Sequence, residues 1–350
     1  MKSYYYFILA ILLLSSSARA QLTDVLTGII SPHGIVFHGS ELHIAEASFN
    51  GKVSKIDVED LNPTPVEVVT GLNGPYGIEL IGNNLFIAEF SGGKVSKIDV
   101  TATNPLAENV VTGLIGPEYL ARKDNDLYVA VSLDDKIIRI SDPHTNPVST
   151  DILTGLNYPT GIAFSGDEMY FVQFLDSSIS KINVSESNPV VELVVSGLNQ
   201  PDGLKMYGTF LYVTESGGDK ISKIDITDPN PVATEVVSGL DGPVDFAIYN
   251  HELYISERYA DKISKISIAP TSVAAVSEIP QPLLYPNPSA GFVHVSNLLG
   301  SKKFNIYDML GAEVLNGTVS EHESIDVQAL TSGHYILSIE NQWSLEFIKE

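Results

Sequence analysis

A repeated unit of 42 residues runs through most of the chain and restricts its possible folds more than any other feature. Each unit contains a Gly-Leu dipeptide at the same position, and a divergent first copy has Gly-Ile 43 residues before the next. The glycines of these dipeptides are Gly28, Gly71, Gly113, Gly155, Gly197 and Gly239. Six units of this length are typical of a quasi-symmetric array in which each unit is one supersecondary element.

Each unit contains four short runs with the character of β-strands. One run follows a Pro-x-Gly motif, a second such as 85–87 is aromatic and aliphatic, a third reads Lys-Val-Ser-Lys-Ile-Asp at 94–99, and a fourth such as 66–69 follows an Asn-Pro turn. β-branched residues between turn formers predict strands, and no stretch has the periodicity of a helix. Four strands repeated six times predict an all-β, six-bladed β-propeller.

The N-terminal part of the repeat region supplies a strand that the last unit lacks. Residues 22–27 match the fourth-strand pattern, whereas the sixth unit ends in the irregular run 269–271. We expect this N-terminal strand to complete the last blade, which closes the ring and leaves no long free edge.

The chain outside the repeats divides into three further segments. Residues 1–20 have a lysine, an apolar stretch and an Ala-x-Ala site before Gln21, which predicts a secretory signal peptide. The propeller is then expected at 21–270 and a proline-containing linker at 271–283. Four alternating runs within 284–350 predict a small antiparallel β-sandwich.

Composition excludes several classes of partner and site. The formal net charge of −23 argues against nucleic acid or an anionic membrane surface as a partner, and it tolerates bound cations. Without cysteine the chain has no disulfide, thiolate zinc site or cysteine nucleophile. No stretch after the signal peptide is apolar for long enough to span a membrane, so we expect an exported, soluble protein that is monomeric.

Glutamates end the predicted second strand of four blades. Each has a lysine opposite it across the following hairpin, an arrangement that predicts structural ion pairs at the rim. These pairs are Glu46 with Lys52, Glu89 with Lys94, Glu215 with Lys220, and Glu257 with Lys262. Four carboxylates on one rim could instead bind a cation, because like charges held close together repel.

The middle residue of each Pro-x-Gly motif is predicted to lie on the same rim, near the central channel. Together with one departure from the motif, these positions are the candidates for ligand binding: His33, Tyr76, Glu118, Thr160, Asp202 and Asp245. His33, Glu118 and Asp202 lie on alternate blades, which places them about 120° apart around the axis. They could hold one divalent cation (Ca, Mg or Zn) or act as acid and base, or they could be ordinary solvated loop residues.

The C-terminal region resembles a known secretion module. It contains Tyr285-Pro286-Asn287-Pro288, Ile306-Tyr307-Asp308 with Gly311, Leu330-x-x-Gly333-x-Tyr335 and Phe347-Ile348-Lys349. These ordered motifs resemble the type A C-terminal sorting domain of type IX secretion substrates, over residues 284–350. The resemblance implies that the type IX machinery is a partner, and that the protein is exported across the outer membrane, to be attached at the surface or released.

Residues 22–270 resemble the NHL, gluconolactonase and streptogramin B lyase group of six-bladed propellers. The shared pattern is a Gly-Pro-x-Gly-Ile start, an Ala/Thr-Glu strand end and a Lys-Ile-Ser-Lys-Ile-Asp third strand. In the gluconolactonases a Glu, an Asn and an Asp hold a divalent metal; Asp202 matches the Asp, whereas Ile30 and Thr160 stand at the other two positions. Streptogramin lyases use a late His and Glu, and no late histidine of this chain matches that role.

Two functions follow from these observations. The first is an exported binding propeller whose ligand is an unidentified surface molecule, polysaccharide or protein. The alternative is a lactonase-like, divalent-metal-dependent hydrolase or lyase that acts at the central channel. The chain contains no nucleophile elbow, phosphate loop or dinucleotide fingerprint, so the sequence leaves open whether the protein is an enzyme.

Overall fold

The computed structural model describes residues 22–268, 283–285, 287–296, 298, 301–309, 312–320, 323–339 and 343–350. The regular elements among the described residues are all strands, apart from the short 3-10 helix η1 (Ser132–Asp134). They contain no helix that is both long and apolar enough to cross a membrane. The predicted signal peptide and residues 271–282 of the predicted linker lie outside the described residues.

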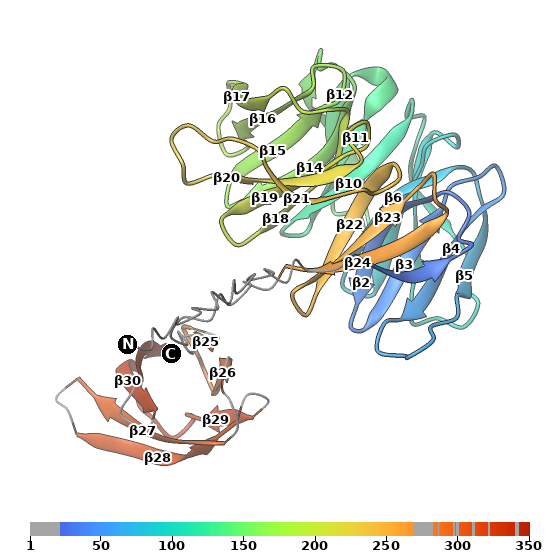
Figure 1. The fold of residues 1–350 in the computed structure, drawn as a ribbon. Helices are drawn as coiled ribbons and strands as arrows, with labels where there is room; N and C mark the ends of the chain where they lie inside the picture. The colour runs from blue at the N-terminus through green and yellow to red at the C-terminus, as the bar shows by residue number, and fades with distance from the viewer. Residues whose placement is uncertain are drawn as a thin grey trace, which may run out of the picture. The chain divides into compact units, whose positions relative to one another are not determined.

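Six four-stranded antiparallel sheets surround a common axis and form a six-bladed β-propeller, which confirms the predicted fold class (Figure 1). Blade 1 consists of β2 (Pro32–His38), β3 (Glu41–Glu46), β4 (Gly51–Asp57) and β5 (Val66–Leu72). Blade 2 consists of β6 (Pro75–Ile81), β7 (Asn84–Glu89), β8 (Lys94–Asp99) and β9 (Glu108–Thr112). Blade 3 consists of β10 (Pro117–Lys123), β11 (Asp126–Val131), β12 (Lys136–Ser141) and β13 (Val148–Thr154).

The remaining three blades repeat this order, and the last one borrows its outer strand. Blade 4 consists of β14 (Pro159–Ser165), β15 (Glu168–Gln173), β16 (Ser178–Asn183) and β17 (Glu192–Ser196). Blade 5 consists of β18 (Pro201–Tyr207), β19 (Phe210–Glu215), β20 (Lys220–Asp225) and β21 (Thr234–Ser238). Blade 6 consists of β22 (Pro243–Tyr249), β23 (Glu252–Glu257), β24 (Lys262–Ser267) and β1 (Thr23–Thr27).

Pairing of β1 with β24 closes the ring, as the sequence predicts. Thr27 lies opposite Lys262 and Thr23 opposite Lys265, with a register shift between them. Lys262 Nζ also lies 2.9 Å from Asp24 Oδ1. The first and last described strands of the propeller therefore belong to one sheet, and β24 is paired on both of its edges.

Apolar side chains fill the space between neighbouring blades. In β7, Leu85 and Ile87 pack in a cluster with blade 1, whereas Phe86 and Ala88 pack in a cluster with blade 3. All four side chains are fully buried. A strand covered on both faces has no polar side to present, which explains why the second run of each repeat is continuously apolar.

The inner strands of adjacent blades approach each other too closely for ordinary side chains. A Cβ atom on Gly34 would lie 2.5 Å from the Tyr76 carbonyl oxygen, and one on Gly77 would lie 2.6 Å from the Glu118 carbonyl oxygen. The glycine of the Pro-x-Gly motif is therefore a packing requirement at these blades. Blades 3 and 6 have Tyr119 and Asp245 at this position instead.

The chain divides into two compact units, Met1–Thr271 and Ser272–Glu350. The second unit contains a three-stranded sheet and a four-stranded sheet, which fit the predicted small β domain. The first is formed by β25 (Leu283–Tyr285), β26 (Phe292–Ser296) and β29 (Ser324–Asp326). The second is formed by β28 (Glu313–Val319), β27 (Lys302–Asp308), β30 (Gly333–Ile339) and β31 (Trp343–Lys349). Val293, Ile306, Leu337 and Phe347 belong to its shared core.

Candidate functional site

The inner strands bring most of the predicted ligand-binding residues to one cavity at the channel. His33, Tyr76, Glu118, Asp202 and Asp245 line this cavity, which has a volume of about 20 Å³ and is called the upper cavity below. Thr160 is not among its lining residues. The Thr160 side chain is buried and donates its hydroxyl hydrogen to the Asp202 carbonyl oxygen over 3.2 Å, so it links two inner strands.

His33 presents a neutral imidazole to the upper cavity. Burial lowers the pKa of His33 to about 4, and the positive charge of Arg258 acts in the same direction. Nδ1 lies 3.1 Å from the Ser31 carbonyl oxygen, so in the neutral ring Nδ1 carries the hydrogen and Nε2 is an acceptor. Nε2 is buried without a hydrogen-bond partner. The ring packs on Tyr76 with centroids 4.1 Å apart.

Burial favours the protonated forms of Glu118 and Asp202 in this cavity. It raises the pKa of Glu118 to about 7, although the hydroxyls of Ser132 and Tyr158 and the charge of Arg258 act in the opposite direction. It raises the pKa of Asp202 well above its usual range, and the Glu118 charge adds to the effect. Glu118 Oε2 is buried without a hydrogen-bond partner. Protonated carboxyls can both donate and accept hydrogen bonds.

The sequence analysis missed Arg258, which supplies the positive charge felt by His33, Glu118 and Asp202. Its guanidinium lies over the Tyr259 ring, 4.7 Å from the centroid, and Nη2 donates to the Tyr259 hydroxyl oxygen over 2.7 Å. Nε is buried without a partner. A signal was available: at this repeat position the other units have Ala47, Phe90, Ser132, Phe174 and Ser216, none of which is charged.

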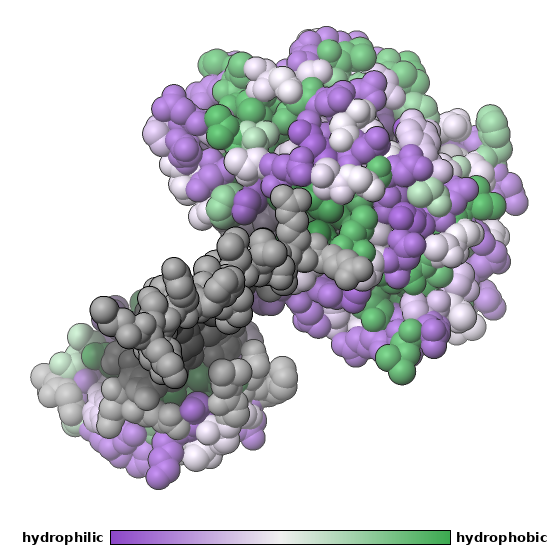
Figure 2. Space-filling view, viewed as in Figure 1, coloured by the Kyte–Doolittle hydropathy of each residue, from purple (hydrophilic) through white to green (hydrophobic). Residues whose placement is uncertain are grey.

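Apolar side chains border the rim on which the upper cavity opens. The second strands of the blades end on this face, and the residues that follow several of them are large, apolar and exposed: Phe49 (89%), Leu133 (54%), Leu175 (63%) and Tyr259 (65%). Tyr76 stacks on Phe90 with centroids 4.6 Å apart, which extends the aromatic surface outward from His33. The propeller face visible in Figure 2 is likewise a mosaic of hydrophilic side chains and apolar patches.

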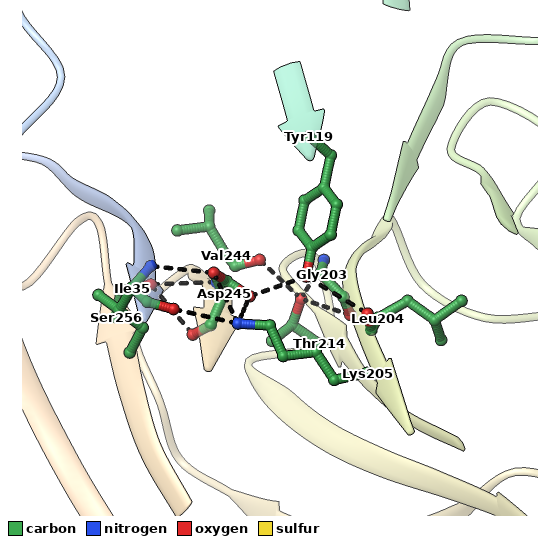
Figure 3. Close-up of polar contacts among 9 residues, drawn as sticks. All are labelled: Ile35, Tyr119, Gly203, Leu204, Lys205, Thr214, Val244, Asp245 and Ser256. Carbon is green, nitrogen blue, oxygen red and sulfur yellow. Dashed lines mark hydrogen bonds and ion pairs between the residues drawn. The ribbon is translucent and has the colours of Figure 1, made fainter. Parts of the chain in front are cut away.

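Tyr119 and Asp245 meet across the channel (Figure 3). Both residues line the upper cavity, so their contact forms part of its wall. The Tyr119 hydroxyl is 3.1 Å from Asp245 Oδ1 and 3.3 Å from the Leu204 carbonyl oxygen. Asp245 Oδ2 accepts hydrogen bonds from the Ile35 amide over 3.0 Å and from Lys205 Nζ over 3.1 Å. The Asp245 carboxylate, a predicted ligand-binding group, is thus fully engaged by the protein itself.

The rim glutamates have the predicted lysines beside them and further partners as well. The Nζ to Oε1 distances are 3.7 Å for Lys52–Glu46, 3.2 Å for Lys94–Glu89, 3.3 Å for Lys220–Glu215 and 3.4 Å for Lys262–Glu257. All four glutamates are buried.

The additional partners come from the third strand and from the incoming loop. Glu89 accepts the hydroxyl hydrogen of Ser96 over 2.7 Å and the Asn73 amide hydrogen over 2.9 Å, and Glu215 accepts the corresponding bonds from Ser222 and Asn199. Glu89 and Glu215 therefore tie their hairpins to the loops that enter blades 2 and 5. The sequence signal is the serine two residues after each lysine.

A metal site is not preassembled at the three residues proposed for it. Among the residues that the structure describes, no group of three or more His, Asp or Glu side chains is placed to hold a metal ion. Arg258 adds positive charge beside His33, Glu118 and Asp202, which opposes cation binding. The three-residue metal site stays a prediction.

The two units of the chain are similar to different groups of known proteins. Residues 283–349 match the family described as the secretion system C-terminal sorting domain. Curated proteins give no match to this chain.

Solved structures share the propeller at low identity. Virginiamycin B lyase from Staphylococcus aureus is 15% identical with a TM-score of 0.53, and the match covers 71% of this chain and 99% of that one. A luciferin-regenerating enzyme is 12% identical with a TM-score of 0.60, covering 71% and 95%. A protein described as a gluconolactonase is 12% identical with a TM-score of 0.59, covering 71% and 92%. At these identities the likeness shows the fold alone.

The sheet order and the solved structures together define the fold of the first unit as a six-bladed β-propeller. The C-terminal residues are a type IX sorting domain, so this propeller is secreted to the cell surface or the extracellular space.

Proposed function

We propose that this exported propeller is a binding protein for a neutral, hydroxyl-rich ligand, such as a surface polysaccharide, whose hydroxyl groups enter the upper cavity. One observation carries the proposal: His33 Nε2, Glu118 Oε2 and Arg258 Nε are buried polar atoms without partners. Buried polar atoms are nearly always hydrogen-bonded in proteins, so three unpartnered atoms near one cavity leave donors and acceptors free for water or for a ligand hydroxyl group.

The surroundings favour an uncharged ligand with an apolar face. Neutral His33 accepts a hydrogen bond, protonated Glu118 donates or accepts one, and Arg258 donates, so a hydroxyl group can satisfy each of them. The aromatic pair Tyr76–Phe90 and the exposed Tyr259 offer surfaces on which the apolar face of a sugar ring can pack. The net charge of −23 disfavours a polyanionic ligand.

The test is calorimetric titration of the purified full chain with neutral oligosaccharides. We expect at least one to bind, and His33→Ala and Glu118→Gln each to weaken it by about tenfold, since each removes a buried hydrogen bond to the ligand. Glu108→Gln, an exposed position on β9, is the matched control and should bind as the parent does. Absence of binding by the whole panel, or binding that is indifferent to both cavity variants, contradicts the proposal.

A second candidate is acid–base catalysis in the same cavity, as in a hydrolase or lyase. The supporting observation is that burial lowers the pKa of His33 and raises that of Glu118, which is how paired catalytic groups acquire separate roles. Some solved structures with this fold are described as a lyase and a gluconolactonase.

Metal analysis separates the metal-dependent form of this candidate from the others. Mass spectrometry is applied to the full chain and to the His33→Ala/Glu118→Ala/Asp202→Ala variant, both purified without chelator. One equivalent of a divalent ion in the parent and none in the variant supports a metal-dependent hydrolase, whereas no metal in either removes it.

A further inference from the structure

A second cavity lies beyond the Tyr119–Asp245 contact. It has a volume of about 190 Å³ and is lined mainly by the inner strands β10, β14 and β18, and we call it the lower cavity. Its lining residues follow Tyr119 along β10 and Asp202 along β18, whereas the upper cavity is lined near the starts of these strands. The lower cavity therefore opens towards the opposite face of the propeller from the candidate site described above.

The lower cavity exists because of which residues occupy one position of the inner strands. At the fifth position of the six strands the side chains are Val36, Glu79, Ala121, Ala163, Lys205 and Ala247. Ala121 and Ala163, on adjacent blades, line the cavity, and their small side chains do not fill it. Glu79 and Lys205 come from blades on opposite sides of the ring, so charged groups border a space that alanines hold open.

The walls combine apolar surface with two cationic groups. Phe164 and Met206, both half-buried, supply apolar surface, and Lys205 and Arg122 supply positive charge. Lys205 is held by Asp245 and by the Ile35 carbonyl oxygen at 3.1 Å.

Arg122 is only loosely committed to the protein. Its Nε lies 3.9 Å from Glu79 Oε1, and its side chain is 59% exposed. A guanidinium with a distant partner at an apolar cavity is suited to bind a carboxylate in two-point fashion.

We propose that the lower cavity binds a small amphiphilic carboxylate, such as a short-chain fatty acid, with its carboxylate on Arg122 and its apolar chain against Ala163, Phe164 and Met206. The lower cavity is separate from the upper one, so this site does not depend on the function proposed above. An amine would be repelled by Arg122 and Lys205, and a neutral alcohol would lack the ion pair.

Glu79 makes the binding depend on pH. Burial raises the pKa of Glu79 to about 7, although Lys205, Arg122 and the Leu80 amide oppose this and Asp245 adds to it. The Tyr119 hydroxyl also faces this acid, and burial holds its pKa well above the ordinary value. Protonation of Glu79 removes a negative charge beside Arg122, so a carboxylate binds more tightly at pH 6 than at pH 8.

The experiment is titration of the purified full chain with sodium hexanoate, with hexylamine and 1-hexanol as probes of charge. Arg122→Gln should weaken hexanoate binding by about tenfold, because it removes the ion pair. Arg139→Gln is the matched control: Arg139 is also in blade 3, its Nε lies 3.8 Å from Asp126, and it lines neither cavity. Ala163→Leu, which fills the cavity, should abolish binding while circular dichroism shows the fold unchanged.

Each outcome decides the proposal. Saturable hexanoate binding that Arg122→Gln weakens and Arg139→Gln does not, and that is stronger at pH 6, supports it. No saturable binding of hexanoate, equal binding of hexylamine, or equal weakening by the two arginine variants overturns it. If Ala163→Leu fails to fold, the comparison of the two arginine variants still decides.

Discussion

At the scale of single residues, two departures from the repeat give the channel its character. The Pro-x-Gly glycine is replaced by Tyr119 in blade 3 and by Asp245 in blade 6, blades that lie opposite each other in a six-bladed ring. Their side chains meet at 3.1 Å across the channel. Both positions depart from the Pro-x-Gly motif in the sequence. That the two side chains reach each other across the channel is visible only in the structure.

The protonation of Glu118 predicts an unusual pH dependence of stability. Its folded pKa is raised, so between about pH 4.5 and pH 7 the folded state binds more protons than the unfolded state, and the free energy of unfolding falls as pH rises. His33, whose pKa is lowered, has the opposite effect between about pH 4 and pH 6.5 in the parent and in the variant alike. We expect Glu118→Gln to gain stability relative to the parent as pH rises, by about 1–3 kcal/mol across the window.

Chemical denaturation at a series of pH values measures this difference. The exposed Glu108→Gln variant is the control. A stability difference between Glu118→Gln and the parent that is constant from pH 4.5 to pH 7 would show that burial does not favour the neutral acid.

At the scale of the element, one side-chain cluster is copied from blade to blade. Glu89 and Glu215 each receive a serine hydroxyl from the third strand and an amide from the incoming loop. Blade 3 has Val131 in place of the glutamate and Ile138 in place of the serine. The polar pair and the apolar pair are thus two alternative ways to fill the same position in a hairpin.

Replacing the polar pair of blade 5 with the apolar pair found in blade 3 tests this interpretation. Glu215→Val alone removes a buried acceptor and leaves Ser222 and the Asn199 amide without it, so it should destabilise the protein by about 2–4 kcal/mol. The double variant Glu215→Val/Ser222→Ile should recover part of that loss, about 1 kcal/mol or more, because it restores a matched apolar pair. Urea denaturation of the parent, both single variants and the double variant completes the cycle, and strictly additive effects would refute the coupling.

The strands themselves could be predicted from the sequence, because each strand pattern recurs in the repeats and turn-forming residues separate the strands. The strand that closes the ring was also predictable, since residues 22–27 carry the pattern that the sixth unit lacks. Arg258 and the lower cavity could not be located in the same way. Their positions depend on how far a side chain reaches and on how small residues from different blades coincide around the axis, which a linear repeat does not encode.

At the scale of the whole molecule, folding and delivery are assigned to different parts of the chain. The sorting domain occupies 283–349, and the propeller strands end at Ser267. We expect a chain truncated after residue 270 to fold as a propeller but to stay inside the outer membrane.

Cell fractionation with surface immunolabelling measures delivery, and circular dichroism of the retained protein measures folding. A chain carrying Glu108→Gln and an intact C-terminal region serves as the export control. Surface appearance of the truncated chain would contradict the division of roles, and so would an unfolded product.

Closure of the ring by β1 also fixes an order of events. Lys262 and Asp24 are 238 positions apart, yet they belong to one sheet. β1 is synthesised first, but its partner β24 is the last strand of the propeller to be synthesised. Blades 1 to 5 can therefore assemble before β1 pairs, while the ring is still open. Such distant pairing slows folding. The first strand of the propeller to be synthesised is therefore among the last to pair.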